Sequence, residues 1–106
     1  MKKYASQATK EYLQTLIDVR VSNLHNRNQF VIKIGSYKVF QSYESIIAVY
    51  DETRNDLYVV EEFINYSKTT SKHLYIFMRE ECNLYTISNL KDLLKSIKKG
   101  NIILIK

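Results

Sequence analysis

The segment Phe30–Gln41, FVIKIGSYKVFQ, decides the fold of this chain because it predicts a β-hairpin with a defined register. Two runs that alternate with a period of two, as strands do, lie on either side of Gly35-Ser36. Glycine at the first of the two loop positions supplies the positive φ that a tight hairpin turn needs. The register that follows pairs Ile34 with Tyr37, Lys33 with Lys38, and Ile32 with Val39.

The two faces of this hairpin differ in character. One face is expected to be the core face and holds Phe30, Ile32, Ile34, Tyr37 and Val39. The other face places Lys33 opposite Lys38, and like charges directly across a hairpin cost up to about 1 kcal/mol. Either the two lysines extend into water toward acids of the next strand, or they prepare a site for an anion such as a phosphate or a carboxylate.

The N-terminal region predicts a helix from Ser6 to about Asn26. Its apolar residues fall on one helical stripe, and the Ser6 hydroxyl can accept a hydrogen bond from an amide of the first turn. The stripe consists of Leu13, Leu16, Ile17, Val21 and Leu24.

The middle of the chain predicts further strands and a helix. Ile46–Tyr50 and Leu57–Val60 are expected to extend the hairpin into an antiparallel meander of about four strands. The hydroxyl side chains of Ser67–Ser71 favour caps and turns. Apolar residues at helical spacing follow them, which predicts a helix from about Thr70 to Glu81.

The C-terminal quarter predicts a short strand, a helix and a final strand. Leu84–Ile87 is the expected short strand, and Ser88 is the expected cap of a helix that stops at Gly100. Ile102–Ile105 is continuously apolar, so it is predicted to be a strand buried on both faces.

The expected fold class is therefore α+β: an N-terminal helix, an antiparallel meander of about four strands, two further helices and a C-terminal strand. The 106 residues fit one domain, 1–106, with the helix in residues 1–28 and an α+β core in 29–106. The chain has no proline and two glycines, so no linker stands out.

Composition also restricts where the protein works. The N-terminal residues have no apolar run behind them, so a signal peptide is not expected. No apolar run approaches the roughly 20 residues of a membrane helix. Cys82 is the single cysteine, which excludes an intramolecular disulfide. The expected location is the cytoplasm of a bacterial host cell, with no membrane partner.

The net charge of +5 is unevenly distributed along the chain. Residues 1–43 have seven bases and two acids, residues 44–62 one base and six acids, and residues 63–106 eight bases and three acids. If the fold does not mix these segments on one surface, the molecule has an acidic flank and a basic flank. Such a dipolar surface suits a binder with a defined orientation. The acidic flank consists of Asp51, Glu52, Asp56, Glu61 and Glu62.

The candidate contacts for a partner protein or nucleic acid are basic: Lys33, Lys38, Lys68, Lys72 and His73. The last three lie in or beside a hydroxyl-rich segment at a predicted helix start, where amides and cations can bind an anion. No glycine permits close approach of the backbone, so the segment is not a phosphate loop. A capped helix start with a surface histidine is the alternative.

Catalytic and metal sites lack support in the sequence. His25, His73 and Cys82 are too few and too scattered for a metal site with recognisable spacing. A catalytic pair of His73 and Cys82 would need both residues on one face of a site. We therefore expect no enzyme activity, no metal and no cofactor.

Two blocks resemble a known but uncharacterised family. Ile34–Ala48, IGSYKVFQSYESIIA, and Tyr66–Leu74, YSKTTSKHL, are similar to an "FxSYxSIIA" block and a "YSxTTSKH" block. These blocks mark small proteins of phages, prophages and plasmids of low-GC bacteria. The resemblance covers the middle half of the chain, and the N-terminal helix looks specific to this member. It implies no functional residue.

What the resemblance implies is context, since small phage proteins without cofactors are commonly binders. The expected function is non-enzymatic, stoichiometric inhibition of a host defence nuclease or nucleoprotein complex, as anti-CRISPR proteins do. The alternative is an accessory or regulatory protein of a phage or plasmid that binds nucleic acid directly.

Overall fold

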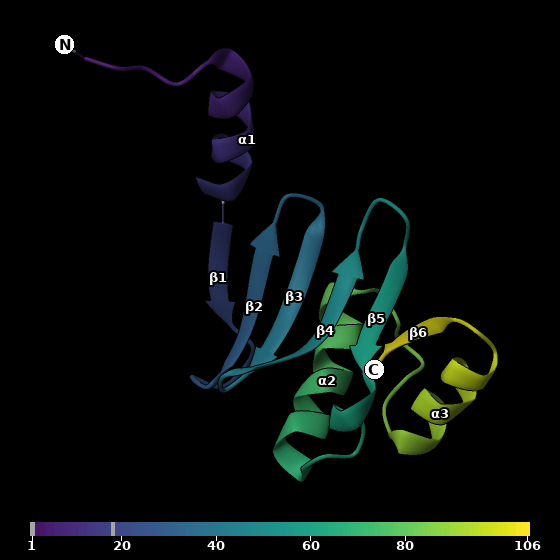
Figure 1. The fold of residues 1–106 in the computed structure, drawn as a ribbon. Coiled ribbons are helices and arrows are strands. Elements are labelled where there is room, and N and C mark those ends of the chain that lie inside the picture. Colours follow the sequence, from purple (N-terminus) through teal and green to yellow (C-terminus); the bar gives the residue numbers. More distant parts are fainter. Residues whose placement is uncertain (1, 18) are drawn as a thin grey trace.

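The protein is an α+β domain built on one six-stranded sheet with the strands in chain order (Figure 1). The computed structural model describes residues 2–17 and 19–106. Strands β1 to β5 form an antiparallel meander, and β6 pairs in parallel with β5. The elements are α1 (Gln7–Ile17), β1 (Val19–Asn23), β2 (Gln29–Ile34), β3 (Tyr37–Ser42), β4 (Ser45–Asp51), β5 (Asp56–Val60), the 3₁₀ turn η1 (Glu61–Phe63), α2 (Lys68–Glu81), α3 (Leu90–Lys98) and β6 (Ile102–Ile105).

The central hairpin, β2 and β3, is confirmed together with its register. Ile34 pairs with Tyr37 and Lys33 with Lys38. Gly35 has φ 57°, the left-handed conformation that glycine adopts without steric cost.

The expected core face of this hairpin is wrong. The buried residues of β2 and β3 include Val31 and Phe40, which share the lysine face, whereas Tyr37 is exposed. Helix α2 packs on the lysine face, where Phe77 stacks on Phe40 with ring centroids 5.6 Å apart. Both faces of the hairpin contain apolar residues, so the face that becomes the core depends on where α2 docks.

The long N-terminal helix is also wrong in its second half. Helix α1 ends at Ile17, and Val19–Asn23 is strand β1, paired with β2. The β-branched Val19 and Val21 alternate with polar residues and extend the hairpin by one strand. Ser6 accepts a hydrogen bond from the Thr9 amide at 3.2 Å, as a cap does. Residue 18 and the side chains of 15–17 lie outside the described residues, so the Leu16 and Ile17 part of the predicted stripe is untested.

The second helix is confirmed and begins two residues earlier than expected. The Ser67 side chain is its N-cap and accepts from the Thr70 amide at 3.1 Å. As a result Lys68, and not Lys72 or His73, occupies the first position of α2.

The C-terminal quarter differs from expectation at two points and agrees with it at a third. Residues 84–87 form a loop, because β5 pairs directly with β6 and leaves no place for a strand between them. The N-cap of α3 is Asn89, which accepts from the Asp92 amide at 2.9 Å, so Ser88 is not the cap. Gly100 adopts φ 80° after α3, which confirms the expected left-handed stop.

Strand β6 is an edge strand and is not buried on both faces. Ile102 points into the core, whereas Ile103 and Ile105 are 40% and 39% exposed. Helices α2 and α3 lie on one face of the sheet, and an edge strand is paired on one side only. Among the described residues, no helix is long and apolar enough to cross a membrane.

Candidate functional site

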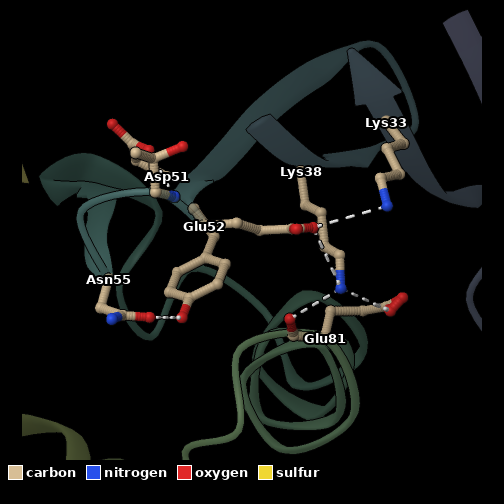
Figure 2. Close-up of polar contacts among 8 residues, drawn as sticks. Lys33, Lys38, Asp51, Glu52, Asn55 and Glu81 are labelled. Atoms are coloured by element: carbon tan, nitrogen blue, oxygen red, sulfur yellow. Dashed lines mark hydrogen bonds and ion pairs between the residues drawn. The ribbon is translucent and has the colours of Figure 1, made fainter. Parts of the chain in front are cut away.

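The two lysines that face each other across the hairpin are held by carboxylates of their own chain (Figure 2). Glu52 Oε1 lies 3.7 Å from Lys33 Nζ and 3.4 Å from Lys38 Nζ. Lys38 Nζ also donates to the main-chain oxygen of Glu81 at 3.1 Å and lies 3.9 Å from Glu81 Oε2. The sequence left two alternatives for these lysines, nearby acids or a bound anion. The structure shows the first, because the lysines lie beside Glu52 of the β4–β5 turn and Glu81 of α2. They do not form an anion site.

The predicted acidic flank is not one surface. Asp51 is buried, and its Oδ1 accepts from the amides of Thr53 and Arg54 in the β4–β5 turn. Asp56 Oδ2 lies 3.7 Å from Arg54 Nε. Glu52 belongs to the lysine cluster described above. Glu61 and Glu62 are the members of this set that are exposed, and both lie in η1.

His73 is not available to a partner. Its side chain is buried, with 5% exposure, and Nδ1 donates to the main-chain oxygen of Thr69 at 2.8 Å. The expectation of a surface histidine is wrong, because His73 lies one helical turn before Phe77 and shares with it the buried face of α2.

Cys82 is equally inaccessible. It is buried at the end of α2, and burial raises the pKa of its thiol far above the ordinary value. A thiol held in its neutral form is a poor nucleophile. Among the described residues, no group of three or more His, Cys, Asp and Glu side chains could hold a metal ion.

The remaining predicted contacts, Lys68 and Lys72, lie together on the exposed side of α2. They line a groove of about 350 Å³ with Tyr75 and Arg79. We call these four residues the basic strip. Their spacing of four, three and four residues places them on one face of the helix. Asn65, Ser71 and Ser88 complete the groove lining.

The basic strip holds positive charge that has no internal compensation. Within residues 2–17 and 19–106, Lys68, Lys72 and Arg79 have no carboxylate within ion-pair distance. Lys68 also occupies the first position of α2, where the positive end of the helix dipole disfavours a cation by about 0.3–1 kcal/mol. An anionic group in the groove would supply the missing counter-charge and would offset the unfavourable interaction of Lys68 with the helix dipole.

Tyr75 adds a neutral hydrogen-bonding group to the strip. Partial burial raises the pKa of its phenol, so it remains protonated at neutral pH. A tyrosine between cations combines a stiff apolar ring with a polar tip, which is a combination common at interfaces.

Arg79 was missed in the sequence. It lies seven residues after Lys72 on a helix that was expected to reach Glu81, so its place on the strip followed from helical spacing. The second half of this helix is dominated by core residues such as Phe77 and Met78, and a single arginine beside them is a weak signal.

The comparisons with known proteins place the chain in a family. A model of a family of unknown function, DUF8033, matches residues 12–85. The chain belongs to this family. The match begins inside α1 and includes β1, so from residue 12 the N-terminal region is not specific to this member. It includes the basic strip and ends before α3. No curated protein and no solved structure matches the chain.

Proposed function

We propose that this DUF8033 protein is a non-enzymatic binder that acts stoichiometrically on a host protein, such as a defence nuclease, by presenting the basic strip to an acidic surface. The observation that carries the proposal is the set of three cations in one groove that the described part of the chain leaves without carboxylate partners. The phage and plasmid context comes from the sequence resemblance alone.

A second basic groove lies on α3, but its lysines have a local role. Lys95 and Lys98 are in the last turn of α3, where the negative end of the helix dipole favours cations. That groove is otherwise lined by Leu90, Leu94 and Lys91, and it offers no hydroxyl or amide side chain. The α2 groove combines cations with hydroxyl and amide groups, which is what recognition of a carboxylate or phosphate needs.

A protein partner is favoured over nucleic acid by the surroundings of the strip. Arg79 follows Lys68 by eleven positions, so the strip is only about 17 Å long at 1.5 Å per residue. The exposed Glu61 and Glu62 precede α2 in η1 and would repel a phosphate backbone that continued past the strip. Mixed charges of this kind match a protein surface better than a uniform polyanion.

The test is affinity capture from a nuclease-treated host lysate with three versions of the full chain. These are the unmodified protein, a strip variant with Lys68→Glu, Lys72→Glu and Arg79→Glu, and a control with Lys91→Glu, Lys95→Glu and Lys98→Glu. The two variants have the same charge change on different helices. We expect one host protein to be captured near 1:1 by the unmodified chain and the control and lost with the strip variant. Equal capture by all three would contradict the assignment of the strip.

A parallel titration separates the nucleic-acid alternative. Fluorescently labelled single- and double-stranded 20-mers are titrated with each version between 50 and 200 mM salt. We expect weak binding that does not depend on the strip. Strip-dependent binding that falls steeply with salt would instead assign the protein to nucleic acid, because released counterions produce that slope.

A further inference from the structure

The face of the sheet opposite α2 is apolar and uncovered. We call it the open face. The strand register places on it Val19, Val21, Phe30, Ile32, Ile34, Tyr37, Val39, Ile46, Val49, Tyr58, Val60, Ile103 and Ile105. None of these residues is buried, and Val21 and Tyr37 are 59% and 47% exposed. Asn23 and Gln41 are the polar residues of β1 to β3 on the same face. A largely apolar surface across six strands is typical of an interaction site.

The charges around the open face restrict which class of partner can bind there. None of its strand positions is a lysine or arginine. Asp51 and Asp56 mark one end, and both are engaged within the β4–β5 turn. A surface without cations does not suit nucleic acid. The face needs an apolar partner.

The N-terminal arm, α1 and β1, is a second uncovered surface. The described side chains of α1, residues 7–14, are exposed, and so is every residue of β1. Tyr12 and Leu13 are 66% and 41% exposed. In Figure 1, α1 extends beyond the end of β1, away from the sheet and from the other helices. A helix of 11 residues is marginal without packing, so α1 needs a surface to lie on.

The chain limits how α1 can reach its own sheet. One residue, Asp18, separates α1 from β1, whereas helix-to-strand connections usually have about 2–6 residues. Folding back over the sheet of the same chain requires a longer connection. A surface on another molecule does not.

We propose that the open face is the interface between two copies of this chain, with α1 of each copy packed on the other. A second copy presents the same apolar face. Because the strand positions of that face hold no lysine or arginine, no two cations would face each other across the two-fold axis. Two sheets pack face to face about 10 Å apart. The contact is isologous, so it closes at a dimer.

The area of the surfaces agrees with this arrangement. Six strands spaced about 4.8 Å and about 17 Å long give a footprint of roughly 400 Å² per copy, or about 800 Å² for two. Stable interfaces bury about 1,200–2,000 Å². A helix about 16 Å long and 10 Å wide adds roughly 160 Å² per copy and brings the total near that range. The arm is therefore part of the interface.

The dimer leaves the basic strips free. Helix α2 lies on the opposite side of the sheet, so the two strips lie on the two outer sides of the dimer. Two binding surfaces on one particle raise avidity where a partner presents two sites. The inference does not depend on what the strip binds.

The test is the mass of the full chain in solution, measured by light scattering and by sedimentation from 1 to 200 μM. We expect twice the 12.6 kDa mass of one chain. The double variant Val21→Lys, Ile46→Lys changes two exposed residues, so the monomer fold should survive. We expect it to be monomeric with an unchanged far-UV circular dichroism spectrum. Leu94→Lys, at an exposed position on α3, is the control and should remain dimeric.

The helix is tested by Leu13→Glu, which we expect to raise the dissociation constant at least tenfold. An unmodified chain that is monomeric up to 200 μM overturns the proposal. If α1 instead covers its own sheet, the unmodified chain is monomeric and Leu13→Glu associates. A double variant that remains dimeric would place the interface elsewhere and also overturn the proposal.

Discussion

The ammonium of Lys38 donates a hydrogen bond to the main-chain oxygen of Glu81, 3.1 Å away at the last residue of α2. It joins a central strand to a helix end 43 residues further along the chain. The last carbonyls of a helix lack partners within the helix, and a cation there also opposes the negative end of the dipole. Lys38 thereby helps to fix α2 on the lysine face of the sheet.

We expect Lys38→Met to lower the free energy of unfolding by about 1–2 kcal/mol, because the helix-end carbonyl and the partly buried Glu52 would lose a charged donor. Lys33→Met is the matched control. Its side chain is 50% exposed, against 21% for Lys38, so its ion pair should contribute less than about 0.5 kcal/mol. Urea denaturation measures both variants. Equal losses of stability in the two variants would show that the lysines act through net charge and not through the contact of Lys38 with the helix end.

Gln29 presents an unusual buried amide. The side chain is fully buried, and neither its nitrogen nor its oxygen has a hydrogen-bond partner among the described residues. Its backbone is satisfied, since the amide donates to Asn26 and the carbonyl accepts from Leu24. The cost of this side chain is the desolvation of a polar group without compensation.

We therefore expect Gln29→Met to raise the free energy of unfolding by about 1 kcal/mol, because methionine fills a similar volume without an unpaired polar group. The same change at Gln41 is the control. Gln41 Nε2 donates to the Tyr43 oxygen at 2.6 Å, so Gln41→Met should lower stability by about 0.5–1.5 kcal/mol. Thermal and urea unfolding measure the opposite signs. A loss of stability in Gln29→Met would mean that the amide has a structural role.

Local features of the fold were predictable from the sequence, and long-range choices were not. Gly35 and Gly100 require left-handed conformations that few other residues adopt, and the hairpin register follows from the first of them. The core face of that hairpin was mispredicted because both of its faces have apolar residues. The choice is made by α2, whose Phe77 stacks on Phe40 from 37 residues away.

The candidate site shows the same difference between local and long-range features. Lys68 and Lys72 were expected among the candidate contacts, and both line the groove on α2. His73 was expected on the surface and is buried, because its surroundings come from distant parts of the chain. For Lys33 and Lys38 the sequence left two alternatives open, and distant carboxylates decide between them. Charge counted along the sequence does not show that Glu52 lies between two lysines.

The buried thiol of Cys82 predicts that the stability of the protein falls as the pH rises. Burial raises the pKa of its thiol far above its ordinary value of 9.0, the carboxylates of Glu81 and Glu52 raise it further, and the nearby Lys38 ammonium acts against them. In the unfolded chain the thiol ionises near 9, whereas in the folded protein it stays protonated. The unfolded state therefore binds fewer protons above pH 9, and stability falls as pH rises.

We expect the free energy of unfolding to be insensitive to this group below about pH 8 and to fall above pH 9 by up to about 1.4 kcal/mol per pH unit. Cys82→Ala should be less stable at pH 7, because it leaves a small cavity, but should lose this slope between pH 9 and 10. Buried tyrosines add their own slope only above about pH 10, since the raised pKa of Tyr50 starts from 10.0. In the native protein at pH 8 the thiol should not react with a thiol-specific chromogenic reagent, and in urea it should react fully. Rapid reaction of the native protein would contradict the burial on which the pH prediction rests.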